Sequence, residues 1–431
     1  MIRRLILSPF QQFVKTESLA GLLLFGATIV ALIWANSPFG EIYQDLWQKK
    51  IGVSFQAFEL EKPLILWIND GLMAVFFFVI GLELKRELII GEINTIKKAV
   101  FPLVAALGGV LVPVGLFLLL NQDPETEKGW GIPMATDIAF ALALLSVLGK
   151  RVPLSLKVFL TAFAIIDDIA AVLVIAIFYS INISWLYILY GIILIGLLGS
   201  LYYFRKYSFP IGIVLAIVIW FLFLKSGVHP TIAGVLLAFT IPIRRRLDVS
   251  AFSDHLNHIS QKLSNVIDNK ERHLLTRDEV KWIDHLDNLA FEVKSPLQHL
   301  EYRLHHLIAY YILPLFAFAN AGVVISFDYD FNLSLMTNIA ISLLVGKFLG
   351  VAFFSYLGNK TGIIEYPSGV SFKQILGISA VAGIGFTMSI FIDNLAFQDP
   401  LMVNSAKVGI IIGSITAAVL GYVILRLSSS R

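Results

Sequence analysis

About a dozen separate stretches of this chain are each apolar over about 20 residues, the length of helix that crosses a bilayer. Of its 431 residues, 57% are hydrophobic and only 15% are charged, whereas soluble domains have about 45–50% apolar and about 25% charged residues. The sequence therefore predicts an all-α polytopic membrane protein in which residues 1–431 form one integral membrane domain.

We expect twelve spans. The first apolar run, 19–34, is interpreted as an uncleaved span, because the small-residue cleavage site of a signal peptide is not convincing here. The other spans are expected at 63–82, 99–120, two within 129–180, 185–204, 209–224, 229–243, 307–325, 334–357, 372–396 and 404–425.

The distribution of basic residues orients the molecule. Twelve spans place both termini on one side, and the loops of that side hold most of the Lys and Arg residues. The opposite side has only Lys49, Lys50, Lys62, Lys128 and Lys225. Because positive loops stay inside, both termini are expected to be cytoplasmic.

Two polar segments interrupt this pattern. Residues 37–63 form an extracytoplasmic loop whose weak alternation allows either a β-hairpin or an irregular loop. Residues 244–305 form a long cytoplasmic insert, and its apolar residues recur at helical spacing at Val280, Ile283, Leu286, Leu289, Ala290 and Val293. We expect an amphipathic helix there, with a second helix starting at Pro296.

Three carboxylates lie inside apolar segments: Asp137 in the fourth span, and Asp167 and Asp168 in the fifth. A charge at the centre of a membrane helix costs roughly 2.5–3.5 kcal/mol on insertion scales, so such a residue is a functional candidate. Lys347, inside the tenth span, is their expected partner. The acids are predicted to bind a small hard cation, such as Na⁺ or Li⁺, and protons in turn.

The two adjacent acids are expected to differ in role. Neighbours on a helix point about 100° apart, so one can coordinate an ion while the other pairs with Lys347. Competition between a proton and a cation for one carboxylate is enough to drive exchange if the site alternates between sides. A purely structural role stays an alternative for Asp137 and Lys347, and Thr136 is either a ligand or a helix cap.

Two spans carry helix breakers near these residues. Pro133 precedes Asp137 in the fourth span, and Gly383 and Gly385 lie in the middle of the eleventh. In transporters, interrupted segments at corresponding places of two halves mark the binding site. Spans three to five and ten to twelve are candidates for such inverted repeats. Asp137 is expected to offset a half-helix N-terminus, and Lys347 a C-terminus.

Other function classes are disfavoured. A net charge of +3 is too small to indicate nucleic-acid binding, and the absence of Cys excludes disulfides and thiolate chemistry. An intramembrane aspartyl protease would place one acid in each of two spans with a GxGD-type motif, which this sequence lacks. We expect neither an enzyme nor a cofactor. A cation channel, or a pH-sensing membrane protein without coupled exchange, stays the alternative.

Several stretches resemble one family: LWINDGLMAVFFFVIGLELKREL, PMATDIAFAL, AIIDDIAA, LKSGVHPTIAG, LPLFAFANAGV and GIGFTMSIF. Together they are similar to the NhaA-type sodium/proton antiporter family over about residues 12–427, apart from the insert. The resemblance implies a bacterial inner-membrane antiporter with twelve spans, in which interrupted spans four and eleven cross at the midplane. It also implies electrogenic exchange of Na⁺ or Li⁺ for protons, regulation by pH, a role in pH homeostasis, and a homodimer with contacts through 37–63.

The resemblance also assigns roles to residues. Asp168 resembles the main cation-binding carboxylate, Asp167 its gating and proton-carrying partner paired with Lys347, and Thr136 and Asp137 the broken-helix positions. Regulation by pH maps onto Glu83, Arg86, Glu87, Glu301 and His305. His229, which opens the eighth span, is a further candidate for that role or a satisfied polar contact.

The chain departs from the family pattern at two positions and in one segment. Tyr302 stands where a second His is expected, Phe348 stands where Pro is expected, and the 244–305 insert is far longer than usual. These departures bear on the pH response and not on the exchange chemistry.

Overall fold

The computed structural model describes residues 9–55, 58–91, 96–180, 182–204, 209–244, 248–266, 277–324, 331–367 and 369–428, and these are helices and loops apart from one strand pair. The first elements are α1 (Pro9–Ala35), α2 (Gly40–Gln48), β1 (Lys50–Phe55), β2 (Phe58–Pro63), α3 (Leu64–Leu66), the π-helical η2 (Trp67–Leu72), α4 (Met73–Ile90), α5 (Ile96–Leu120), the 3-10 helix η3 (Glu127–Met134), α6 (Ile138–Val147), η4 (Gly149–Arg151) and α7 (Leu154–Phe178). The remaining elements are α8 (Trp185–Tyr203), α9 (Phe209–Ser226), α10 (Thr231–Thr240), α11 (Val249–Val266), α12 (Arg277–Val293), α13 (Pro296–Leu307), the π-helical η5 (Ile308–Ile312), α14 (Leu313–Asn320), α15 (Leu333–Ile341), the π-helical η6 (Ser342–Gly346), α16 (Lys347–Lys360), α17 (Phe372–Val381), α18 (Phe386–Ala396) and α19 (Pro400–Ser428).

The lengths of these helices show a polytopic membrane protein. Within the described ranges, eight helices are long and apolar enough to cross a bilayer, or nine if α17 and α18 together count as one bent span. Two shorter apolar helices, Pro210–Ser226 and Thr231–Thr240, lie at the seventh and eighth expected spans. The all-helical membrane class is confirmed, and the count of twelve spans stays a prediction.

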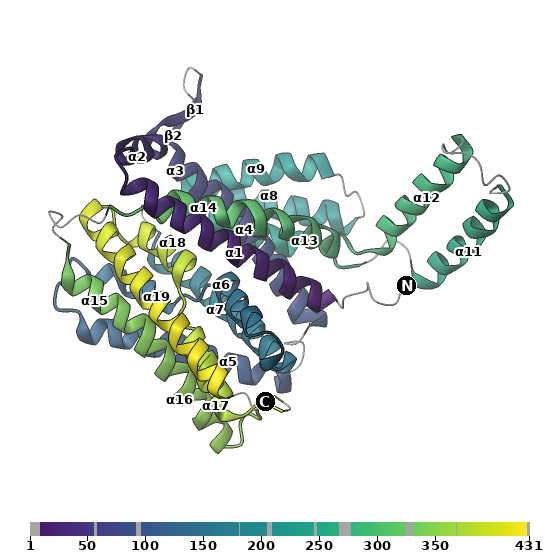
Figure 1. Cartoon of the computed structure of the whole chain (residues 1–431). Helices are drawn as coiled ribbons and strands as arrows, with labels where there is room; N and C mark the ends of the chain where they lie inside the picture. The colour runs from purple at the N-terminus through teal and green to yellow at the C-terminus, as the bar shows by residue number, and fades with distance from the viewer. Residues whose placement is uncertain are drawn as a thin grey trace.

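The helices pack in two groups that meet along α1. Figure 1 shows α4, α13 and α14 together, and α5, α6, α7 and α15 to α19 as a second group; α1 packs against α14 and α6. One apolar core is built around Phe77, Phe316 and Phe391, and a second around Phe163. The acids of α7 therefore lie within the second group, on a helix that also contacts α4 of the first.

Two breaks in the helices meet inside the second group. Helix η3 and α6 are separated by 135–137, and α17 and α18 are separated by 382–385 with a bend of 44°. The amide of Asp137 donates to the carbonyl oxygen of Ile384 at 2.6 Å. Glycine permits this approach, because a Cβ on Gly385 would lie 3.0 Å from the carbonyl oxygen of Ala135.

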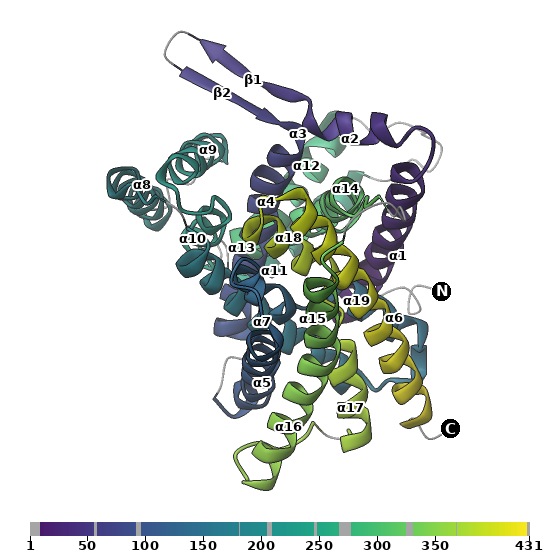
Figure 2. The same cartoon turned by 90° about the vertical axis from the view of Figure 1, so that its left-hand side faces the viewer.

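The segment 37–63 contains α2 and an antiparallel pair, β1 and β2, with Lys50 opposite Pro63 and Phe55 opposite Phe58. Residues 56 and 57 lie outside the described residues. Figure 2 shows this hairpin projecting from one end of the molecule, and α16 and α17 reaching the other end. The expectation that the termini are cytoplasmic concerns residues 1–8 and 429–431, which also lie outside the described part of the chain.

The 244–305 insert holds three helices, α11, α12 and α13, and residues 245–247 and 267–276 lie outside the described residues. Helix α13 begins at Pro296 as expected from the sequence, and the Ser295 side chain accepts from the amide of Gln298 as its N-cap. Helix α11 was not among the expected elements. Figure 1 shows α11 and α12 standing side by side, apart from the membrane helices.

Candidate functional site

Lys347 and Asp167 form an ion pair with no exposed surface. Lys347 Nζ donates to both carboxylate oxygens of Asp167 at 2.8 Å, and their side chains are 0% exposed. Lys347 is the first residue of α16, directly after the π-helical η6, a kind of segment found often at functional sites. A buried ion pair is stable only when its geometry is good and its other hydrogen bonds are satisfied.

Thr136 provides the third hydrogen-bond acceptor for this ammonium group. Lys347 Nζ donates to Thr136 Oγ1 at 2.9 Å, and that hydroxyl donates to the carbonyl oxygen of Ala382 at 2.9 Å. Ala382 directly follows α17, so the ammonium is linked through Thr136 to a half-helix C-terminus. Of the two roles left open for Thr136, capping belongs instead to its neighbour Asp137.

Asp137 accepts hydrogen bonds from the starts of two half-helices. Its Oδ1 accepts from the amide of Phe140 at 3.0 Å, in the first turn of α6. Its Oδ2 accepts from the amide of Thr387 at 3.0 Å and from the Thr387 hydroxyl, in the first turn of α18. Helix N-termini carry partial positive charge, so one buried carboxylate offsets two of them.

Asp168 lies next to this network without joining it. Its side chain is buried, with 3% of the residue exposed, yet the described residues include no ion pair between it and Lys347. Asp167, Asp137 and Glu83 act on it electrostatically. Lys347 also acts on it. Asp168 is therefore a buried carboxylate beside the Lys347–Asp167 ion pair, with three other acids in its surroundings.

Five of the residues expected to regulate the protein form one cluster between α4 and α13. Arg86 contacts Glu301, and it donates to Glu87 at 2.8 Å. His305 Nδ1 lies 3.6 Å from Glu83 Oε1. Burial raises the pKa of Glu301 from 4.5 to about 7, although the nearby Arg86 guanidinium opposes that rise.

His229 lies outside that cluster. Its Nε2 is 3.7 Å from Asp70 Oδ1, and its Nδ1 is 2.7 Å from Thr231 Oγ1. Lys62 makes an ion pair with the same Asp70 at 2.9 Å. Of the six residues expected to regulate the protein, the structure thus brings five together and places His229 in a separate polar contact.

Sequence reasoning missed a second polar network and a second buried acid. Asn320 exchanges hydrogen bonds with Asn69 at 2.9 and 3.2 Å and accepts from Asn394 at 2.8 Å. Asp393 in α18 is completely buried. The criterion that selected Asp137 and Asp168, an acid inside an apolar span, would have found Asp393 as well.

In the described part of the chain, no group of three or more His, Cys, Asp or Glu residues is placed to hold a metal ion.

Comparisons with known proteins place these residues in a known family. The family model described as "Na+/H+ antiporter 1" matches residues 11–425. The "Na(+)/H(+) antiporter NhaA" of Oleidesulfovibrio alaskensis is 45% identical, over 98% of this chain and 94% of its own length. The "Na(+)/H(+) antiporter NhaA 1" of Saccharophagus degradans is 44% identical over 97% and 91%, and that of Aliarcobacter butzleri is 42% identical over 96% of each chain.

Proposed function

This chain belongs to the Na⁺/H⁺ antiporter family, and on that basis we propose that it exchanges Na⁺ or Li⁺ for protons across the bacterial inner membrane. The observation that carries the proposal is the position of Asp168. It is a buried acid beside the Lys347–Asp167 ion pair, in the helix group where the two breaks meet.

Asp168 binds the cation, and protons compete with it. An ionised carboxylate provides two oxygen ligands to Na⁺ or Li⁺, and a proton on either oxygen removes the charge that holds the ion. High proton concentration on one side therefore releases the cation, and high cation concentration on the other side releases the proton. Two neighbouring carboxylates in a low dielectric resist ionising together, so Asp167 and Asp168 release their protons as a coupled pair.

The Asp167–Lys347 pair gates the site and carries a further proton. When Asp168 binds a cation, the positive charge near Lys347 increases and weakens the attraction that holds the ammonium to Asp167. If that pair and Asp168 each carry a proton, two protons move for each monovalent cation. The exchange is then electrogenic.

The wider architecture of the proposal has twelve spans with cytoplasmic termini. Spans four and eleven are interrupted and cross at the membrane midplane as parts of inverted repeats. The hydrogen bond from the amide of Asp137 to Ile384 and that from Thr136 to Ala382 support such a crossing. The β1–β2 hairpin lies on the extracytoplasmic side and contributes to a homodimer, and the Glu83–Glu301 cluster adjusts activity to pH.

A gradient assay on inside-out vesicles tests this function. With an acidified lumen, we expect Na⁺ and Li⁺, but not K⁺, to dissipate the pH gradient at some pH between about 5 and 8. A flux of K⁺ that is not coupled to the pH gradient would indicate a channel. No response at any pH, with the protein present in the membrane, would indicate a sensor or another function.

Asp168→Asn tests the assignment of the site. The amide keeps the shape of the carboxylate but carries no charge and binds no proton competitively, so we expect exchange to be abolished while the protein still inserts. Asp254→Asn, which removes an exposed carboxylate from α11, is the matched control and should exchange normally. Normal exchange by Asp168→Asn would remove Asp168 from the site.

A further inference from the structure

Asp393 of α18 is a fully buried acid that the proposed exchange site does not use. It has 0% exposed surface, and neither carboxylate oxygen has a hydrogen-bond partner among the residues that the structure describes. The positive charge of Lys407, in α19, acts on it. Burying a carboxylate without hydrogen bonds is costly, which indicates that the group is kept for a reason other than stability.

The position of Asp393 on α18 links it to both ends of that helix. Ser389 lies four residues before it and donates to the carbonyl oxygen of Ile132 in η3 at 2.8 Å. Ala396 lies three residues after it and lines a cavity. Residues three and four apart share one helix face. Asp393 is six residues, or about 9 Å of helix, from Thr387, which contacts Asp137.

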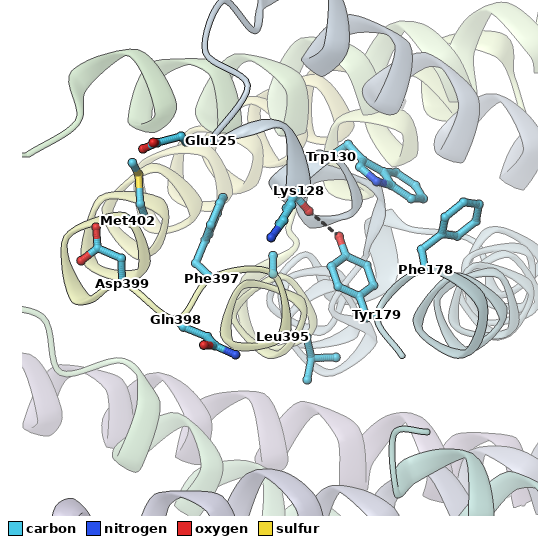
Figure 3. Close-up of a pocket in the computed structure, with 11 residues that line it drawn as sticks. Glu125, Lys128, Trp130, Phe178, Tyr179, Leu395, Phe397, Gln398, Asp399 and Met402 are labelled. Atoms are coloured by element: carbon cyan, nitrogen blue, oxygen red, sulfur yellow. Dashed lines mark hydrogen bonds between the residues drawn. The ribbon is translucent and has the colours of Figure 1, made fainter. Parts of the chain in front are cut away.

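The cavity has a volume of about 450 Å³ and lies where η3, α7 and the α18–α19 junction meet. Figure 3 shows Glu125, Lys128 and Asp399 around it, and Tyr179, whose hydroxyl donates to the carbonyl oxygen of Lys128 at 2.8 Å. Tyr179 also lies within electrostatic range of Asp393. Asp393 thus lies on α18 between Ala396, which lines the cavity, and the helix break that holds Asp137, although Asp393 itself does not line the cavity.

The surroundings of Asp393 suit a proton better than a sodium ion. A hard cation needs several oxygen ligands at once, but the nearest hydroxyl on this face, that of Ser389, is already committed to Ile132. The positive charge of Lys407 also repels a cation. A proton needs only one carboxylate oxygen, and its binding removes the charge that burial disfavours.

We propose that Asp393 is a second proton-binding residue, which passes protons between this cavity and the Asp137–Asp168 region. In the uptake step, a hydronium ion from the cavity reaches Asp393 past Ala396; an O–H bond forms at one carboxylate oxygen while one O–H bond of the hydronium ion breaks and leaves water. In the release step, the O–H bond at Asp393 breaks and a water molecule on the side toward Asp137 gains the proton. The relay rests on the proposed exchange function.

Infrared spectroscopy of the purified protein tests proton binding without transport. The difference between spectra at low and high pH reports each carboxylic C=O that gains a proton. We expect the wild type to show one band that Asp393→Asn lacks and that Asp393→Glu shifts. Glu365→Gln, which removes an exposed carboxylate elsewhere, should keep the band. Spectra that are the same for the wild type, Asp393→Asn and Asp393→Glu would overturn the proposal.

Exchange in proteoliposomes tests the relay itself. We expect Asp393→Asn to slow exchange by about a hundredfold or more, the order of effect of a positioned proton-transfer group. The Na⁺ concentration for half-maximal rate should not change. A wild-type rate would overturn the relay, and so would a changed Na⁺ requirement at an unchanged maximal rate.

Two further measurements separate the possible failures. If Asp393→Asn folds poorly because Lys407 loses its counter-charge, the double variant Asp393→Asn/Lys407→Gln removes both charges and should show the same slow exchange; a wild-type rate in it would equally overturn the relay. If the wild type itself does not exchange, the proposed function fails, whereas the infrared band still decides whether Asp393 binds a proton.

Discussion

Lys347 donates to side-chain oxygens on two other segments, and all of these groups are buried. One ammonium thereby joins α16, α7 and the break before α6. Asp137 also joins two helices, because its carboxylate accepts hydrogen bonds from amides in the first turns of α6 and α18. At the residue scale, the crossing of the two breaks depends on two buried side chains that each satisfy several partners.

Lys347→Met should destabilise the protein, because it leaves Asp167 as an uncompensated buried charge. Removing one partner of a buried ion pair typically costs roughly 3–5 kcal/mol. Thermal unfolding in detergent measures the loss. The double variant Lys347→Met/Asp167→Asn removes both charges and should recover much of the stability. A single variant that melts with the wild type would show that the pair contributes little.

At the scale of the element, close contacts between helices set the position of Lys347. Helices α5 and α16 cross where Gly108 faces Gly350, and a Cβ on either glycine would clash with the backbone of the other. Small residues let membrane helices approach closely. Because α16 begins at Lys347, this crossing determines how far the ammonium group reaches toward α7.

Gly108→Ala should therefore push α5 away from α16 and weaken the fold by roughly 1–3 kcal/mol, the usual range for overpacking. Gly115→Ala on the same helix is the matched control, since a Cβ there meets no atom within 4 Å. We expect a lowered melting temperature and slower exchange for the first variant only. Equal effects of the two variants would assign the loss to something other than this contact.

The contact between α13 and α4 should respond to pH through Glu301. Its pKa is raised from 4.5 to about 7 in the folded protein, so the folded state binds a proton more tightly than the unfolded state does. The stabilisation is complete below about pH 4.5, and it is lost as the pH rises toward about 7. Glu83, Glu87, Arg86 and His305 face the same carboxyl.

Glu301→Gln should remove that part of the pH dependence, because the amide does not titrate. Melting temperatures measured in steps from about pH 4 to 8 should fall more in the wild type than in the variant. Hydrogen exchange in α13 should rise over the same interval in the wild type. Parallel curves for the two proteins would show that another group controls this contact.

The whole molecule consists of a membrane body and a helical pair, α11 and α12, that packs chiefly against itself. Ile259 of α11 and Leu289 of α12 are buried, whereas Val280 and Ile283 are exposed. The insert joins the body through α13, which carries Glu301 and His305. The α11–α12 pair is therefore connected through α13 to the cluster between α4 and α13. It is distant from α7 in the sequence.

Deletion of 250–290 should leave exchange intact and shift its pH profile, since the deletion spares α13 and every residue of the exchange site. Vesicle assays across the pH range compare the two proteins, and membrane insertion of the shortened protein is checked in parallel. Loss of all exchange in a normally inserted protein would assign the pair a direct part in transport.

The sequence by itself determined the class of this protein and its candidate site. Apolar runs of about 20 residues dictate helices in a bilayer because the backbone has no other way to satisfy its hydrogen bonds there. Acids within those runs are costly enough that they indicate function. These signals are local, so they identified Asp137, Asp167, Asp168 and Lys347 without any knowledge of the packing.

Only the tertiary structure decided which of these residues meet. The residues alone left open which acid pairs with Lys347, and the family resemblance implied Asp167. That pairing, and the hydrogen bonds of Asp137 to the first turns of two half-helices, are consequences of contacts between residues distant in the chain. A helical period says which residues share a face, but not which neighbour that face meets. The choice of neighbour depends on the close approach of helices at particular glycines and on the break points, which only packing reveals.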